Sequence, residues 1–98
     1  MENEVNRKLY ALLEENKVFI NRESSPARLA KAIGISQKEL EKTVFESTGI
    51  TLSLVLELYR IQNARELLIQ GFDYETVCTL SGFPSRGAME RAFEVIVG

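Results

Sequence analysis

The chain has 98 residues, of which 45% are apolar and 27% charged, a size that suits one small domain or two very small ones packed together. Twelve basic and fourteen acidic side chains give a formal net charge of −2, so the chain lacks the strongly basic balance that would point to nucleic acid at once. Its single cysteine excludes an internal disulfide, no apolar run is long enough for a membrane span, and the N-terminus lacks a signal-peptide pattern, so we expect a cytoplasmic protein.

The first predicted element is an amphipathic helix over residues 2–16. Leu9, Leu12 and Leu13 recur there with the i, i+3, i+4 spacing of one helix face. The apolar run 18–20 follows. A lone strand would have no partner to pair with, so we expect this run to be a connector that packs on the core.

Two shorter helices are predicted next, each opened by a serine and closed by a glycine. Ser25 precedes a proline at the first position of the helix 26–33, an arrangement typical of an N-cap followed by proline. Ser36 caps the helix 37–48 and has a glutamate three residues on, which is the spacing of a capping box.

The C-terminal half begins with the longest predicted helix, over residues 51–70. Its apolar residues cover most of the circumference, which indicates a helix buried on more than one side between two packed units. A short helix capped by Asp73 follows and ends at Gly82. The stretch GFPSRGAMERAF, residues 82–93, then predicts a sharp turn, a capping Ser85 and a further helix.

One helix-turn-helix pattern occurs twice, on either side of the long helix. In each copy a small residue lets the two helices approach, a glycine supplies the positive φ of the turn, and an apolar residue fills the space beneath it. The second copy has one extra residue in its turn. The equivalent pairs are Ala30 and Cys78, Gly34 and Gly82, Ile35 and Phe83, Ser36 and Ser85, Leu40 and Met89, and Val44 and Phe93.

The residues left facing outward on the two second helices share one spacing, i, i+1, i+4, i+5, and so lie on one face of each helix. They are Gln37, Lys38, Glu41 and Lys42 in the first copy and Arg86, Gly87, Glu90 and Arg91 in the second. Exposed charges are usually only a solvated surface. Two copies with the same outward pattern favour a surface that recognises a partner.

Four segments together resemble the DNA-binding domain of AraC/XylS-type bacterial transcription regulators. They are LAKAIGIS, FESTGIT, YRIQNARELL and VCTLSGFPSRGAMERAF, spread over residues 25–93. The resemblance implies an all-α fold of about seven helices, with two helix-turn-helix subdomains joined by a long central linker helix. We therefore divide the chain into residues 1–50, 51–70 and 71–98.

The resemblance also implies a function: each second helix enters the major groove of double-stranded DNA, in successive segments about one turn apart, to regulate transcription. The outward residues named above become the base-facing candidates, and Ser85 is a further DNA-binding candidate. Lys42 and Arg91 stand where the family commonly has a basic residue and could donate to guanine. The helix N-termini at Ser25 and Ser36 are candidate phosphate contacts.

The chain departs from the family pattern in its charges. Val44-Phe45 stands where Phe-Lys is frequent, and Glu94-Val95 stands where Lys-Lys is frequent. This acidic balance leaves a second hypothesis open, a protein-interaction module of the same fold that binds RNA polymerase or another regulator. An effector-binding domain absent from this chain is a further candidate partner.

The sequence lacks the residues that catalysis or metal binding would need. The sequence has no histidine and no glycine-rich phosphate loop, and its one cysteine has no basic partner in the motif. A typical zinc site needs several cysteine or histidine ligands. We therefore expect no enzyme, no metal site and no cofactor.

Overall fold

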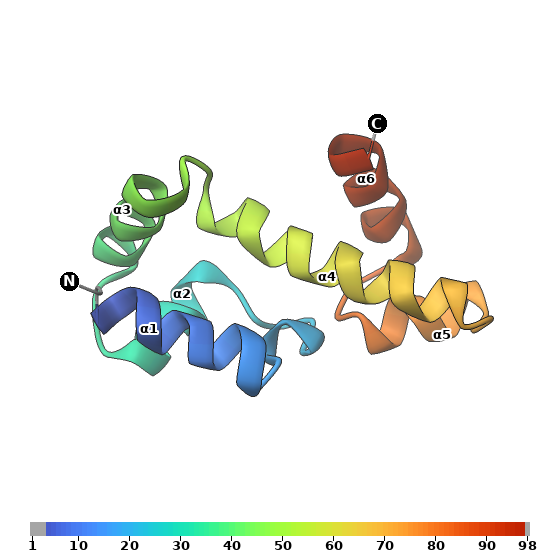
Figure 1. Ribbon diagram of the computed structural model, residues 1–98, viewed down its shortest axis with the longest axis horizontal. Coiled ribbons are helices and arrows are strands. Elements are labelled where there is room, and N and C mark those ends of the chain that lie inside the picture. The colour runs from blue at the N-terminus through green and yellow to red at the C-terminus, as the bar shows by residue number, and fades with distance from the viewer. Residues whose placement is uncertain (1–3, 98) are drawn as a thin grey trace. The chain divides into compact units, whose positions relative to one another are not determined.

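The computed structural model describes residues 4–97, and this part of the chain is helical with no strand (Figure 1). The all-α prediction is therefore confirmed; the predicted start of the first helix at Glu2 lies outside the described residues. In chain order the elements are α1 (Glu4–Tyr10), the π-helix η1 (Ala11–Glu15), the 3-10 helix η2 (Val18–Ile20), α2 (Pro26–Ile33), α3 (Gln37–Thr48), α4 (Leu52–Ile69), α5 (Tyr74–Leu80) and α6 (Arg86–Val97).

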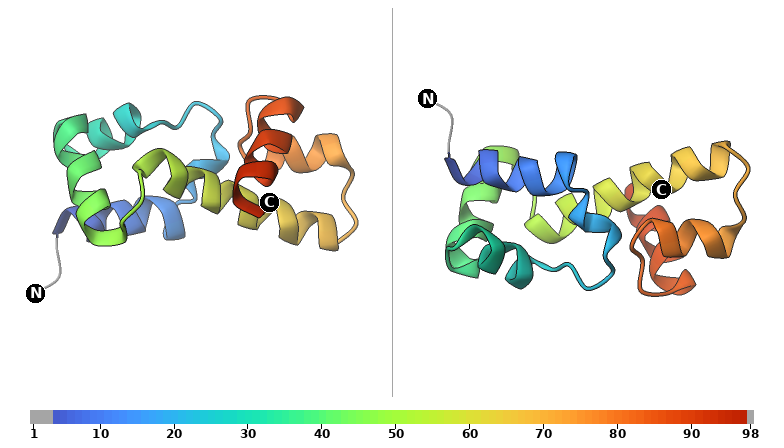
Figure 2. Two further views of the ribbon diagram at one scale, coloured as in Figure 1. Left: turned by 90° about the horizontal axis from the view of Figure 1, so that it is seen from above. Right: turned by 90° about the horizontal axis from the view of Figure 1, so that it is seen from below.

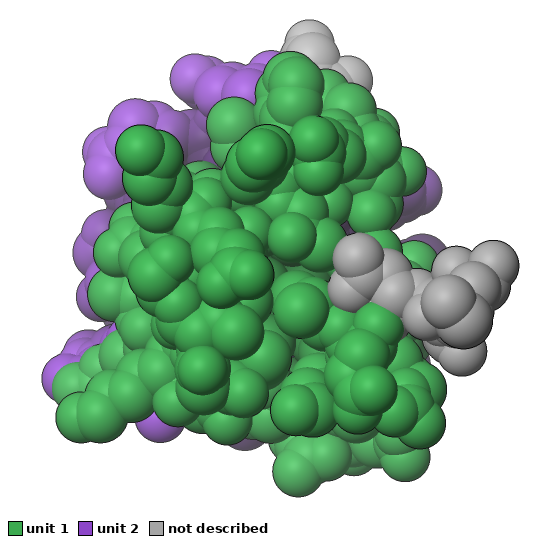
Figure 3. Space-filling view, turned by 90° about the vertical axis from the view of Figure 1, so that its left-hand side faces the viewer, with its two compact units in different colours: residues 1–18, 24–56 green, residues 19–23, 57–98 purple. Residues whose placement is uncertain are grey.

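The chain forms two compact units, which Figure 3 colours separately. Unit 1 consists of Met1–Val18 and Ser24–Leu56, and unit 2 consists of Phe19–Glu23 and Glu57–Gly98. Helix α4 begins in unit 1 and ends in unit 2. The short segment Phe19–Glu23 belongs to unit 2 although it lies between η1 and α2 in the sequence.

Unit 1 is built from α1, α2, α3 and the start of α4. Helix α1 packs against both α2 and α3, as the two views in Figure 2 show. Its buried Leu9 and, one turn later, Leu13 in η1 belong to the unit's apolar interior, together with Leu40 and Val44 of α3. A helical N-terminus is confirmed, with Leu9 and Leu13 buried and Leu12 half-buried, although residues 11–15 form a π-helix.

Unit 2 is built from the rest of α4 with α5 and α6. Its core includes Ile61 and Ala64 of α4, Val77 of α5 and Met89 of α6, each at most 3% exposed. Asn63 of α4 donates through Nδ2 to the Leu80 carbonyl and to the Ser81 hydroxyl, both at 3.1 Å. These bonds satisfy the fully buried Ser81 at the end of α5.

The segment Phe19–Glu23 is held in unit 2 by two close backbone approaches. The buried guanidinium of Arg60 donates from Nε to the Phe19 carbonyl at 2.9 Å and from Nη2 to the Asn21 carbonyl at 3.1 Å. A Cβ added to Gly82 would lie 2.8 Å from the Ile20 carbonyl oxygen and nearer still to that of Phe19. The predicted connector therefore packs on the core, with Phe19 only 5% exposed.

Helix α4 differs in one respect from the expectation of burial on more than one side. Leu52 and Leu56 are buried, as are Ile61 and Ala64, but Leu58 is 38% exposed and Ile69 is 83% exposed. Apolar side chains around most of α4 are therefore not all buried. None of the helices in residues 4–97 has the length and hydropathy that a bilayer-spanning helix requires.

Candidate nucleic-acid interface

The turn between the two helices has one equivalent hydrogen bond in both copies of the motif. In the first copy the Ile35 N–H donates to the Ala30 carbonyl at 3.1 Å; in the second the Phe83 N–H donates to the Cys78 carbonyl at 3.2 Å. Gly34 and Gly82 have φ values of 92° and 83° at equivalent positions. These are the features of a helix end with a left-handed glycine, so the repeat seen in the sequence is a repeat in the structure.

The second helix of each copy starts in the same way. The Ser36 hydroxyl accepts from the Glu39 N–H at 3.1 Å, and the Ser85 hydroxyl accepts from the Ala88 N–H at 3.1 Å. The first buried residue of each helix follows four positions after the cap, and both are fully buried: Leu40 in α3 and Met89 in α6. Cap and anchor together fix which residues of α3 and α6 face outward.

On α3 the sequence candidates form one outward face. Gln37, Lys38 and Lys42 are exposed, and Glu41 is half-buried. Phe45, one turn after Glu41, is 56% exposed. Together with Glu41 and Lys42 it lines a shallow, mainly apolar concavity that ends at the start of α4.

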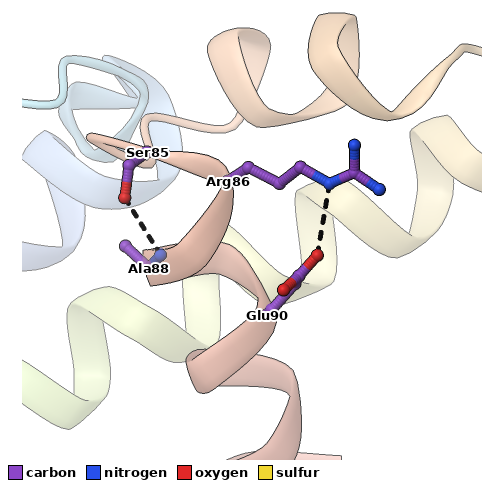
Figure 4. A network of polar contacts seen from close by, with 4 residues as sticks. All are labelled: Ser85, Arg86, Ala88 and Glu90. Carbon is purple, nitrogen blue, oxygen red and sulfur yellow. Dashed lines mark hydrogen bonds and ion pairs between the residues drawn. The ribbon is translucent and has the colours of Figure 1, made fainter.

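On α6 the exposed side chains interact with one another. The Arg86 Nε donates to Glu90 Oε1 at 3.2 Å (Figure 4), and the Arg86 guanidinium carbon lies 4.7 Å from the centre of the Tyr74 ring. A Cβ added to the half-buried Gly87 would lie 3.2 Å from Arg91 Nη1, so the Arg91 guanidinium lies across this glycine. The structure therefore brings all four predicted residues of α6 onto one face.

This repeated architecture agrees with the comparison with known protein families. A family model described as a helix-turn-helix domain matches residues 29–98, most of the chain. The chain belongs to the AraC-type helix-turn-helix family. Comparisons with curated proteins and with solved structures found no match.

An AraC-type domain is a DNA-binding module of transcription regulators, which is a binding function rather than a catalytic one. The one thiol of this AraC-type domain lies inside unit 2, where Cys78 is 8% exposed. Burial first, and then the charge of Glu75, raise the pKa of the Cys78 thiol above its ordinary value. A buried thiol that resists ionisation is a packing residue and a poor nucleophile. In residues 4–97 no group of three or more histidine, cysteine, aspartate or glutamate side chains lies together as a metal-ligand set.

The two serines named as phosphate candidates lie at helix starts in this AraC-type domain. Ser25 accepts from the Arg28 N–H at 3.2 Å and so caps α2, while Ser36 caps α3. Pro26 has no N–H, so at α2 only the Ala27 N–H is left among the first three positions. At α3 the N–H groups of the first two positions are left, which makes Ser36 the better phosphate candidate of the pair.

One residue of this surface was not among the sequence candidates. That residue is Tyr74, which packs against the core of unit 2. Its contact with Arg86 joins the first residue of α5 to the first residue of α6. No local spacing relates residues 74 and 86, so only the fold reveals this pair.

Proposed function

We propose that this AraC-type domain binds double-stranded DNA sequence-specifically through α3 and α6, placed in successive major-groove segments, and thereby regulates transcription. The observation that carries the proposal is the repeat. Two turns that share an equivalent hydrogen bond and a left-handed glycine are each followed by a capped helix with a fully buried anchor, so the same outward register occurs on both helices. We keep residues 1–50, 51–70 and 71–98 as the functional division, in which the linker helix separates the two helix-turn-helix motifs along the sequence.

The outward side chains of α3 suit direct contact with base edges. Gln37 can bond adenine through its amide in bidentate fashion, Lys38 and Lys42 can donate to guanine, and Glu41 can accept from the amino group of cytosine. On α6 the guanidinium of Arg91 can donate to guanine O6 and N7. Of the candidate phosphate contacts, Ser25 and Ser36, it is Ser36 at the start of α3 that lies where two backbone N–H groups can receive a phosphate, and Ser85 stays a DNA-binding candidate at the start of α6.

The competing function is the interaction module that binds RNA polymerase or another regulator. One observation favours it: the negative charge is concentrated in one unit. Unit 1 has seven basic and seven acidic side chains, whereas unit 2 has five and seven, so the whole formal charge of −2 belongs to unit 2. Net negative charge opposes the approach of phosphate, and it lies in the unit that contains α6.

Selection of bound duplexes from random DNA, followed by fluorescence anisotropy titrations at about 50 and 200 mM salt, tests the proposal. A DNA reader should retain a defined sequence, and its affinity should fall steeply with salt because each phosphate contact releases counterions. Absence of binding at about 50 mM salt, where these contacts count most, would favour the interaction module.

A further inference from the structure

We propose that Tyr74 and Glu90 position Arg86 as a reader of a guanine in the major groove. The proposal rests on the DNA-binding function above and assigns a base to one side chain. Arg86 is the first residue of α6, directly after the capping Ser85 (Figure 4). The N-terminal residues of a recognition helix are those that contact base edges in helix-turn-helix proteins.

The position of Arg86 is not explained by the stability of α6. A cation at the start of a helix meets the positive end of the helix dipole, which disfavours it. The ion pair with Glu90 runs from arginine to glutamate along the chain, which is the less favourable order for an i, i+4 pair. Both side chains are also more than half exposed, at 63% and 51%, so the pair on its own contributes little to folding.

The two contacts instead fix the direction of the guanidinium. The guanidinium carbon lies over the Tyr74 ring, well within the distance at which an aromatic ring attracts a cation. Glu90 engages Nε from the side. The Tyr74 ring packs against the core of unit 2, so it is a fixed support. An arginine that is already restrained loses less rotamer freedom when it binds.

The geometry leaves the outer end of the guanidinium available for recognition. With Nε engaged by Glu90, the groups Nη1 and Nη2 remain as a pair of parallel donors. Guanine is the base that offers two acceptors side by side in the major groove, O6 and N7. Glu90 then acts as a positioning residue for Arg86 from within α6, and Tyr74 does so from α5.

The test replaces each guanine of the selected duplex in turn by 7-deazaguanine, which lacks the N7 acceptor, and measures the dissociation constant by anisotropy. Wild-type protein should lose roughly five- to tenfold in affinity at the guanine that Arg86 reads, since the substitution removes one of the two acceptors of a bidentate pair, which as a whole is worth more. This loss should vanish in Arg86→Ala. It should be reduced, but not abolished, in Arg86→Lys, because an ammonium can still donate to guanine but lacks the planar fork of a guanidinium.

The positioning role is tested by the same ratio in further variants. The ratio is the dissociation constant for the 7-deazaguanine duplex divided by that for the guanine duplex. Tyr74→Leu and Glu90→Ala should each reduce this ratio about two- to fivefold, whereas Tyr74→Phe should keep it because the ring remains. Tyr10→Leu, at an exposed tyrosine of unit 1, is the matched control and should also keep it. The ratio compares two duplexes with one protein sample, so a lower folded fraction does not change it. Glu90 is exposed, so its variant remains informative if Tyr74→Leu fails to fold.

Three outcomes would overturn the proposal. If Arg86→Ala weakens binding to all sequences alike, Arg86 contacts phosphate and the general DNA-binding function stands. If the ratio is unchanged in both Tyr74→Leu and Glu90→Ala, the positioning role is wrong while the guanine contact stands. If wild-type protein binds no duplex at all, the proposed function fails and this proposal fails with it.

Discussion

Gly87 is the second residue of α6, where glycine is less favourable for the helix than alanine by up to about 1 kcal/mol. Its backbone is helical, so no left-handed turn explains the residue. The absence of a side chain at Gly87 leaves room for the Arg91 guanidinium, because a Cβ added there would lie 3.2 Å from Arg91 Nη1. At the scale of single residues, a local cost in helix propensity accompanies the placement of a cation on the proposed reading face.

Arg91→Ala tests whether that cation reads a base. We expect the variant to bind the preferred duplex more weakly by about 1–3 kcal/mol and to lose its preference at one base pair, because a bidentate contact to guanine is removed. Competition titrations with single-base variants of the duplex measure both effects. Arg65→Ala, at an exposed arginine on α4 of the same unit, is the matched control. An equal loss for every sequence would instead make Arg91 a phosphate contact.

The two helix-turn-helix elements share a turn but differ in what surrounds it. Gly34 and Gly82 both have positive φ, yet a Cβ on Gly34 meets no heavy atom within 4 Å. A Cβ on Gly82 meets the backbone of Phe19 and Ile20. The first glycine is therefore required by conformation alone, and the second by conformation and by close packing against the connector.

This difference predicts unequal costs for the same substitution. Gly34→Ala should lower the free energy of unfolding by about 1–2 kcal/mol, the cost of a left-handed conformation for a residue with a Cβ. Gly82→Ala should lower it by about 3–5 kcal/mol, since overpacking against a backbone that cannot turn away adds to the same strain. Urea unfolding of both variants measures the two values. Equal costs would show that the connector does not press on Gly82.

The cap of α5 gives this element a pH dependence. Asp73 accepts from the Thr76 N–H at 2.9 Å and from the Thr76 hydroxyl at 3.0 Å, and these hydrogen bonds hold the pKa of Asp73 below its ordinary value. A carboxyl group with a lowered pKa in the folded state contributes stability above its unfolded pKa, near 3.9. That stability is lost as the pH falls further, through the folded pKa.

Asp73→Asn should therefore lose less stability than the wild type between about pH 5 and pH 2.5, because the amide oxygen can still cap the helix but does not titrate. Asp73→Ala, which has no acceptor, should be less stable than the wild type at pH 5. Urea unfolding curves at the two pH values measure these differences. Parallel pH profiles for wild type and Asp73→Asn would show that this cap is not the titrating group.

Local chemistry was enough to predict most elements of this fold. The serine and aspartate caps, with a glycine at the end, marked α2, α3 and α5 to within a residue, since these signals act within one helical turn. Contacts between distant residues left no such signal. The bonds from Arg60 to the connector and the Tyr74–Arg86 contact depend on how whole elements pack. For the same reason the sequence could not show that the apolar Ile69 of α4 stays exposed, because composition does not say which faces of a helix find a partner.

At the scale of the whole molecule, the chain passes between its two units three times. It does so within α4 and at both ends of the segment Phe19–Glu23. The chain leaves unit 1 before this segment and returns to unit 1 after it. Unit 2 is thus completed by five residues that precede its helices by more than thirty positions. The buried Arg60 has two of its hydrogen-bond acceptors in that segment. Stability of the second helix-turn-helix therefore depends on chain that comes before the first one.

A fragment of residues 51–98 contains α4, α5 and α6 but lacks the segment that Arg60 and Gly82 contact. We expect it to melt without a cooperative transition, because the buried Arg60 guanidinium loses two of its acceptors and one side of the turn at Gly82 loses its packing. Joining residues 17–24 to its N-terminus through a flexible linker of about 20 glycine and serine residues, about 25 Å in root-mean-square length, should restore a cooperative transition. Circular dichroism during heating measures both. Arg60→Met in the joined fragment should lower its melting temperature sharply, since this change removes both bonds to the segment while keeping similar apolar volume. A cooperative transition in the fragment without the segment, at the temperature of the joined one, would show that residues 51–98 fold without the segment.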